Sequence, residues 1–302
     1  MKKPFTLAIP AVFFALLLGG CAEIQKLKSP ELVLPLTALP DYAQGEQYIY
    51  DNGNSETVIA KEGNILTWRT NNGIVRKTYR NFTIPYLNWQ TATRRGSSET
   101  DARPDMLWPL KVGNTESFNF TRNAADNDGK NSRTYKQIWQ CKVEGTETVR
   151  IALGSYDTFK IVCHRYNGKT WRQTRTYNYA PLIGHYVLRR DSFLSGPSDR
   201  RELVSYGFNS SVFSVAEQQS LTKAVQDTLS NNKNGEISYW RGSKGSPRIG
   251  INPLTLETNS KGLTCRSYEG VFSDTQRIRT NRRYACRRAD GVWVHSRIEQ
   301  NN

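Results

Sequence analysis

The chain has 302 residues, with 42 Lys and Arg against 27 Asp and Glu, which gives a formal net charge of +15. A hydrophobic fraction of 37% that includes 7 Trp and 15 Tyr excludes a disordered chain, and a mean hydropathy of −0.64 excludes a protein with many membrane-spanning helices. The length suits two domains of ordinary size, and the positive surplus suits an anionic partner but also keeps a protein soluble without one.

Residues 1–20 have the pattern of a secretory signal peptide. Lys2 and Lys3 form a basic start, and the run from Phe5 to Leu18 is almost wholly apolar. This run is shorter than the ~20 residues that a helix needs to span a bilayer. We therefore expect the segment to be removed during export.

A cysteine follows the apolar run after two small residues. Leu18-Gly19-Gly20-Cys21 resembles the lipobox of bacterial lipoproteins, in which the signal is cut before a cysteine that carries the lipid chains. The resemblance implies acyl chains such as palmitate on Cys21, and Ala22 after it implies sorting to the outer membrane. The alternative is an ordinary signal peptide that ends near a cysteine.

Residues 21–44 read as the lipidated cysteine and a tether. Pro30, Pro35 and Pro40 interrupt this segment, which shows no sustained apolar period and is expected to be semi-extended. Loss of residues 1–20 removes two lysines, so the mature chain keeps 40 basic and 27 acidic side chains, a net +13. The positive charge therefore belongs to the mature protein.

Residues 45–210 are expected to form a β-rich domain, because short runs rich in Thr, Val, Ile, Tyr and Trp alternate with Gly, Asn and Asp clusters that suit turns. Strands are predicted at 47–50, 57–60, 65–70, 75–79, 139–149, 156–163, 172–179, 185–190 and 202–208. Residues 91–104 and 123–132 are polar and rich in turn formers, so both are predicted to be exposed loops.

Four cysteines remain in the mature chain, which is an even number in an exported protein and favours two disulfides. There are 21 residues between Cys141 and Cys163 and 20 between Cys265 and Cys286, and each interval reads as strand, turn, strand. Cysteines equally far from a hairpin turn face each other across the ladder, so we predict these two pairs, with a bulge in the first hairpin. A zinc site or a redox pair is the alternative, but neither has the close C-x-x-C spacing it usually needs.

The pattern changes near residue 211, where a second domain of residues 211–302 is expected to begin. Ser214 and Glu217 match a capping box, and apolar residues at helical spacing follow to Leu229. The sequence predicts one amphipathic helix of about four turns, with strands after it at 237–241, 263–272, 277–286 and 292–297. The fold class is thus mainly β: two antiparallel β-rich domains, the second (α+β) opened by a helix.

Three motifs in residues 214–297 carry a resemblance to a known family. They are Gly235-Glu236-Ile237-Ser238-Tyr239-Trp240, Gly262-Leu263-Thr264-Cys265-Arg266-Ser267-Tyr268 and Ala285-Cys286-Arg287-Arg288-Ala289-Asp290-Gly291-Val292-Trp293. In order and spacing they resemble the C-terminal domain of the rickettsial seventeen-kilodalton surface antigen family. The glycine zipper that precedes this domain in the antigen is missing here.

The first domain is similar to a β-rich envelope domain of unknown function found in bacterial lipoproteins. The similarity rests on Trp139-Gln140-Cys141, the alternating run from Val143 to Val149, and Tyr179-Ala180-Pro181 followed by Gly184. Both resemblances imply an envelope location, and neither implies a reaction.

Catalytic motifs are scarce. His164, His185 and His295 lie in different predicted strands, and no G-x-S-x-G, H-E-x-x-H or P-loop pattern occurs. One S-x-x-K stands at Ser220 and Lys223, but it lacks the companion motifs of penicillin-binding enzymes and is read as chance. We expect no catalytic residue, no metal and no cofactor.

One predicted strand carries a row of basic residues. The row is Arg277, Arg279, Arg283 and Arg287. Ile278, Tyr284 and Cys286 have the other parity, so alternation predicts arginines on the solvent face and apolar residues on the core face. Such a row suits a phosphate or carboxylate, and the alternative is a solvated face that guards a sheet edge.

These features predict a non-enzymatic outer-membrane lipoprotein that acts as a binding or scaffold module in the cell envelope. Expected partners are the membrane through the lipid anchor and anionic lipids, lipopolysaccharide, cell-wall polymers or envelope proteins, whereas the compartment argues against nucleic acid. Two alternatives stay open. An envelope hydrolase acting on wall or glycan requires a deep pocket with converging carboxylates or a histidine, and an acyl-chain carrier requires an apolar cavity in the first domain.

Overall fold

The structure is a computed structural model that describes residues 32–242, 248–273 and 278–296. The expected signal peptide, Cys21 and the first part of the expected tether lie outside these residues. The described chain is mainly antiparallel β structure with one α-helix, so the predicted fold class is confirmed.

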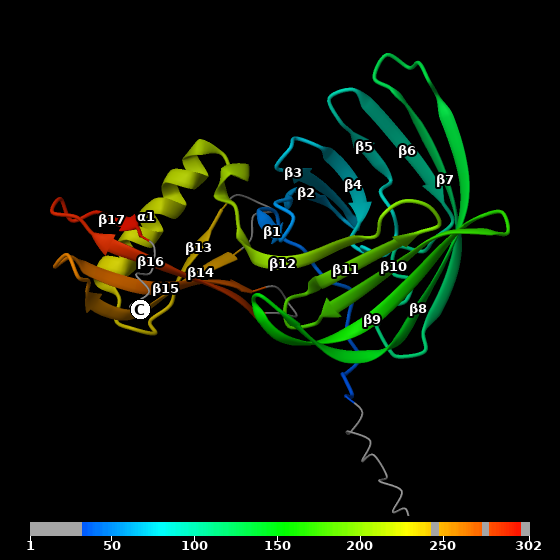
Figure 1. Ribbon diagram of the computed structural model, residues 1–302. Helices are drawn as coiled ribbons and strands as arrows, with labels where there is room; N and C mark the ends of the chain where they lie inside the picture. The colour runs from blue at the N-terminus through cyan, green and yellow to red at the C-terminus, as the bar shows by residue number, and fades with distance from the viewer. Residues whose placement is uncertain (1–31, 243–247, 274–277, 297–302) are drawn as a thin grey trace, which may run out of the picture. The chain divides into compact units, whose positions relative to one another are not determined.

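Residues 46–208 contain twelve strands that form a closed antiparallel barrel (Figure 1). Each strand pairs with the next along the chain, and β1 pairs with β12 to close the ring. The strands are β1 (Glu46–Tyr50), β2 (Ser55–Glu62), β3 (Ile65–Thr70), β4 (Val75–Tyr79), β5 (Asn88–Gln90), β6 (Arg94–Thr100), β7 (Thr115–Asp126), β8 (Arg133–Ile151), β9 (Gly154–Asn167), β10 (Thr170–Ala180), β11 (His185–Phe193) and β12 (Asp199–Phe208).

The two segments predicted to be long loops are partly strands, so this prediction was wrong for residues 94–100 and 123–126, whereas residues 127–132 do form the connection between β7 and β8. Residues 91–104 contain β6, and residues 123–132 contain the end of β7, which pairs with β6 as far as Asp126 opposite Arg94. The side chains of β6 are exposed or half-buried along its whole length. Because neither face is buried, the strand has no apolar alternation by which its sequence could be recognised.

Side chains of one parity fill much of the barrel interior. On β9, Phe159, Ile161 and Cys163 are all at most 1% exposed. The loop between β4 and β5 adds Ile84 to this core and is fixed by Asn81, whose side-chain amide donates to the Met106 carbonyl. The core includes Tyr48, Val58, Leu66, Trp68, Phe118, Phe120, Trp139, Val143, Tyr177, Tyr179, Val187 and Leu203.

Both pairs of cysteines expected from hairpin spacing form disulfides. Cys141 lies directly opposite Cys163 in the ladder of β8 and β9, where a bulge between Val143 and Gly145 shifts the register. Cys265 lies opposite Cys286 in the second sheet. Each disulfide thus joins neighbouring strands of one hairpin.

The remaining described chain forms a five-stranded sheet with one helix. The strands lie in the order β13 (Ser238–Arg241), β14 (Arg248–Thr258), β15 (Thr264–Ser273), β16 (Ile278–Arg287) and β17 (Trp293–His295). Strand β14 was not predicted, because Pro253 interrupts its sequence and such a residue argues against a central strand. The ladder accommodates it through a register shift between Pro253 and Leu256. The predicted domain boundary near residue 211 stays a prediction.

Helix α1 (Val215–Asn231) begins as the sequence indicated. Ser214 and Glu217 form a complete capping box. At the other end, the buried guanidinium of Arg266 donates to the Leu229 and Asn232 carbonyls at 2.7 and 2.8 Å, which satisfies helix-terminal acceptors. Gln226 also holds the Trp293 backbone on both sides, which fastens the C-terminal half of the helix to the sheet.

Over the described part of the chain, no helix is long and apolar enough to cross a membrane.

Candidate functional site

A cavity of about 130 Å³ lies inside the barrel, and its wall is rich in arginine. The lining residues include a single carboxylate, Glu56, together with tryptophan, tyrosine and glutamine side chains. The arginines are Arg76, Arg80, Arg122, Arg165, Arg175 and Arg189. Most of them occupy inward positions of strands that elsewhere carry the apolar core, so the barrel interior contains both a packed apolar region and a cationic region.

Asp191 neutralises two of these arginines. Its carboxylate is 1% exposed and lies 2.5 Å from Arg175 Nε and 2.5 Å from Arg189. Arg175 faces Asp191 in the ladder of β10 and β11, and Gln173 also donates to the carboxylate at 2.6 Å. Burial alone would raise the pKa of Asp191, but the two arginines outweigh it and hold that pKa below its usual range.

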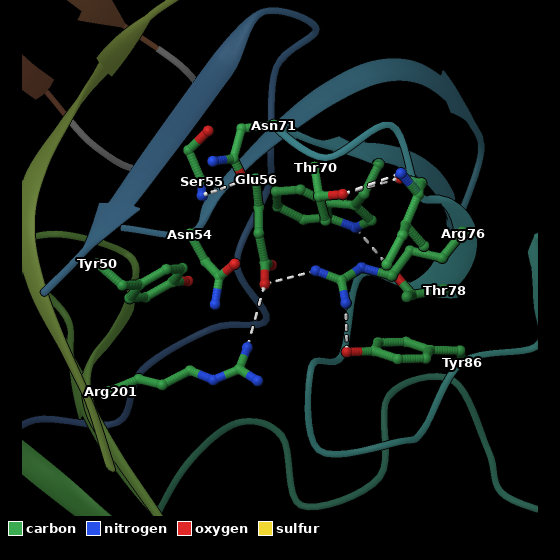
Figure 2. Close-up of polar contacts among 12 residues, drawn as sticks. Tyr50, Asn54, Ser55, Glu56, Thr70, Asn71, Arg76, Thr78, Tyr86 and Arg201 are labelled. Carbon is green, nitrogen blue, oxygen red and sulfur yellow. Dashed lines mark hydrogen bonds and ion pairs between the residues drawn. The ribbon is translucent and has the colours of Figure 1, made fainter. Parts of the chain in front are cut away.

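Glu56 neutralises a third arginine. Figure 2 shows its carboxylate between Arg76, at 2.5 Å, and Arg201, at 3.8 Å. Arg76 also donates to the Tyr86 hydroxyl, and its guanidinium lies 4.5 Å from the centre of that ring. Burial would lower the pKa of Arg76, but Glu56 outweighs it and the pKa lies above its ordinary value. Outside this cluster, Arg80 pairs with Asp41 at 3.0 Å.

Two cavity arginines differ from the rest. Among the described residues, neither Arg122 nor Arg165 has a carboxylate within 4 Å. The Nε atom of Arg165 is buried and has no hydrogen-bond partner, and Arg122 lies 5.1 Å from the centre of the Trp89 ring. Burial, followed by the charges of Arg175 and Arg122, lowers the pKa of Arg165, and burial also lowers the pKa of Arg122. Arg122 and Arg165 are therefore partly desolvated cations with no carboxylate beside them among the described residues.

The barrel register brings a third donor beside these two cations. Trp139 lies opposite Arg165, and Gln137 lies opposite Phe120, two residues before Arg122. Trp139 Nε1 donates to the Gln137 side-chain oxygen at 3.3 Å, which leaves the amide NH₂ of Gln137 as a donor on the cavity wall. Two guanidiniums and an amide suit a carboxylate or phosphate, and the cavity volume suits one such group more than a whole large ligand.

No histidine in the described chain is placed as a free base. His185 lines the cavity, but its two ring nitrogens lie 2.8 and 2.9 Å from the Tyr42 and Tyr50 hydroxyls. Burial also raises the pKa of Tyr50. His164 contacts Thr174 and His295 contacts Tyr268, so the three rings lie in separate places.

The S-x-x-K motif likewise makes no catalytic pair in the described structure. Ser220 accepts from Trp240 Nε1 at 3.1 Å, and Lys223 pairs with Asp227. The described residues also contain no group of three or more His, Cys, Asp and Glu side chains that could hold a metal ion.

The arginine row predicted from the sequence lies elsewhere, on β16. Arg277 and the side chain of Arg279 fall outside the described part of the structure. Arg283 is half-buried, and Arg287 is exposed and donates to the Gly291 carbonyl at 3.2 Å. The expected orientation holds only in part: Tyr284 and Cys286 are buried and Arg287 is exposed, but Ala285, which has the parity of the arginines, packs in the core beneath α1. Tyr284 and Cys286 form a separate cluster with Cys265, so the disulfide does not mark the helix-covered face.

Sequence reasoning missed Arg122 and Arg165 as candidate site residues. A signal was present on β9, where Phe159, Ile161 and Cys163 share one parity and Arg165 continues it. A basic residue in an otherwise apolar parity indicates a cation inside the barrel. Which strands lie around that cation depends on how the strands pair, and the residue pattern of a single strand does not show that pairing.

No protein-family model matches this sequence, and no curated protein matches it. The resemblance of residues 214–297 to the seventeen-kilodalton antigen family is therefore not shown and stays a prediction. One solved structure that is similar is a hypothetical lipoprotein, YmcC, from Escherichia coli (K12), with a TM-score of 0.38 and 12% identity over 53% of this chain and 83% of that one. Nothing about the cavity follows from this distant likeness.

Proposed function

We propose that the chain is a lipid-anchored envelope protein whose barrel binds an anionic group non-enzymatically. The observation that supports this function is the pair Arg122 and Arg165, which lie on the cavity wall without a carboxylate partner among the described residues. A ligand carboxylate or phosphate would supply the missing counter-charge. Lipopolysaccharide, acidic cell-wall polymers and anionic lipids are the envelope components with such groups.

The energetics favour a ligand role over a stabilising role for these two side chains. A buried charge without a partner destabilises a fold, whereas the same charge in a binding site gains a strong hydrogen bond when the anion arrives. The protein already balances the other four cavity arginines with its own carboxylates; these are Arg76, Arg80, Arg175 and Arg189. Two arginines are left whose most favourable partner comes from outside the chain.

The alternative of a hydrolase has less support from the same cavity. Glu56 and Asp191 are both held in arginine pairs, and the low pKa of Asp191 makes it a poor proton donor near pH 7. His185 is enclosed by tyrosine hydroxyls. An acyl chain in the barrel also has less support, because the apolar region is filled by the barrel's own side chains.

The binding test uses residues 22–302, which include the compact unit 32–302 and omit the expected signal and Cys21. Calorimetric titration with phosphate, glucuronate and lipopolysaccharide should show saturable binding for at least one probe, and binding should weaken as salt rises. Arg165→Gln should weaken it about 10- to 100-fold, since a hydrogen bond to a charged group contributes about 1.5–3 kcal/mol. Arg150→Gln is the matched control, because Arg150 is exposed on neighbouring β8. Equal losses for the two variants, or no binding of any probe, would exclude the barrel site.

The anchor is tested separately on the full chain. Cys21→Ala should abolish lipid attachment and signal cleavage before residue 21, which mass spectrometry of the mature protein would show. Fractionation on a density gradient should place the wild-type protein with the outer membrane. Recovery of the wild type in the inner membrane would contradict the sorting that Ala22 implies.

A further inference from the structure

We propose that the groove between α1 and the second sheet is a separate binding site, for a single acyl chain that ends in a carboxylate. The inference does not depend on the barrel cavity, because it uses none of its residues. It rests on a largely apolar groove whose wall also carries one cation, Arg283, and a fatty-acid-like amphiphile matches both features.

The groove has a volume of about 450 Å³, within the range of small-molecule sites. Its walls are mostly aliphatic and aromatic side chains from the helix and the sheet. They are Leu221, Val225 and Leu229 of α1 and Ile249, Ile251, Ala285 and Trp293 of the sheet. Several of these residues pack in the core beneath the helix, so the groove continues the apolar core outward and is not an isolated surface dimple.

Small residues leave this space open. Gly270 and Ala285 lie on the groove wall on neighbouring strands β15 and β16, where larger side chains would fill it. The helix is held to the sheet by Arg266 and Gln226 near its C-terminal end and by Ser220, which accepts from Trp240. These contacts fix the helix without requiring side chains to fill the groove.

Arg283, Tyr268 and His295 lie together among the polar side chains of this groove, which also include Ser210, Gln218, Thr222 and Gln226. Arg283 is half-buried on β16 and, within residues 32–242, 248–273 and 278–296, forms no ion pair with a carboxylate. Tyr268 and His295 lie close to it, with the Tyr268 hydroxyl 3.2 Å from His295 Nε2 and the two rings stacked at 5.9 Å. Burial, followed by the charge of Arg283, lowers the pKa of His295, so this ring is neutral near pH 7.

The number of positive charges in the groove indicates which ligand head group fits it. One guanidinium balances one negative charge, and its fork matches the two oxygens of a carboxylate. A phosphate dianion would bring a second negative charge that Arg283 alone does not balance. An uncharged lipid would leave the guanidinium of Arg283, which donates to the Phe208 carbonyl at 3.4 Å, without a counter-ion. The occupant is therefore a monoanionic carboxylate on an apolar chain.

The experiment titrates residues 22–302 with octanoate, decanoate and laurate below their micelle concentrations, and with methyl laurate, by calorimetry. Affinity should rise about fourfold for each added methylene, since each buried CH₂ contributes ~0.8 kcal/mol. Laurate should bind at least 10-fold more tightly than its methyl ester. Absence of saturable laurate binding, or equal binding of acid and ester, would overturn the proposal.

Variants of β16 separate a binding role from a structural one. Arg283→Gln should remove the preference for laurate over methyl laurate while ester binding is kept, and Arg283→Lys should restore part of it. Arg282→Gln is the matched control, because Arg282 is exposed and pairs with Glu269 at 3.1 Å. If Arg282→Gln reduced the preference as much as Arg283→Gln, the head-group assignment would be wrong.

A second pair of variants distinguishes this site from the barrel cavity. Ala285→Leu should fill the groove and weaken laurate binding at least 10-fold. The double variant Arg122→Gln, Arg165→Gln should bind laurate like the wild type. Loss of laurate binding in the barrel variant would place the ligand in the barrel and contradict the groove.

Discussion

Two regions of the barrel interior are built from the same strands but differ in what balances their side chains. On β9, Phe159 and Ile161 point into a core of aromatic and aliphatic neighbours, and Arg165 continues the same face into the cavity. In the apolar region the side chains pack against one another inside the protein. In the cationic region Asp191 balances two arginines, while Arg165 lies without an anionic partner among the described residues.

An inward-facing position does not by itself stabilise a barrel. Apolar side chains gain free energy from burial, whereas buried ions gain it only when their partners are present. We therefore expect the two regions to respond in opposite ways to substitution. Substitutions in the two regions should differ in both the size and the sign of their effect on the free energy of unfolding.

Truncation in the apolar region should have the largest effect. Phe159→Ala removes a ring that is 1% exposed and should lower the free energy of unfolding by about 3–5 kcal/mol through lost transfer energy and a new cavity. Urea titration followed by tryptophan fluorescence measures it. Lys160→Ala, the partly exposed neighbour on the same strand, should change the value by less than about 1 kcal/mol. Equal effects would show that the apolar region is not the stabilising core.

Removal of the anion in the cationic region should have the next largest effect. Asp191→Asn leaves Arg175 and Arg189 without their carboxylate and should cost about 3 kcal/mol in the free energy of unfolding. Asp157→Asn changes an exposed carboxylate on β9 and should cost less than about 0.5 kcal/mol. A stability loss confined to the control would contradict the role of Asp191.

The same carboxylate gives a pH dependence of defined sign. Because the folded pKa of Asp191 is lowered, its contribution is fully present above its unfolded pKa of about 4 and is lost as pH falls through the folded value. Urea titrations from pH 7 to pH 2 should therefore show the wild type and Asp191→Asn converging in stability at the acid end. A constant difference between the two proteins across this range would contradict the lowered pKa.

Loss of the unpaired cations should have the smallest effect and the opposite sign. Arg122→Gln with Arg165→Gln should leave the free energy of unfolding unchanged or raise it by about 1 kcal/mol, because two desolvated charges are removed. Thermal unfolding without ligand measures it. A loss comparable to that of Phe159→Ala would show that these arginines are structural, and the contrast between the two regions would disappear.

Local patterns in the sequence predicted the elements but not their assembly. Alternation and turn residues indicated the strands around Ile65 and Tyr156, and hairpin spacing indicated both disulfide pairs. Closure of the barrel and the meeting of Arg122 with Arg165 depend on pairings between strands far apart in sequence. The residue pattern of each strand by itself does not show which distant strand it pairs with.

The arginine row on β16 has the predicted alternation, but the face of the strand that packs against the helix is not the predicted one. The shared parity of Ile278, Tyr284 and Cys286 predicts that these residues mark the core face. Cys286 is indeed buried, but in a small cluster with Tyr284, whereas Ala285 lies beneath the helix. A small residue between arginines was the better indicator of the face that α1 covers.

The closure of the barrel by β1 and β12 has a consequence for biogenesis. Tyr50 pairs with Leu203, so the first strand must wait for nearly the whole barrel sequence before its second neighbour exists. Until then its free edge can pair with other chains, and contacts of such long sequence separation form slowly. The newly made chain is therefore expected to need a holding chaperone before the ring closes, and a shorter chain that ends before β12 should aggregate.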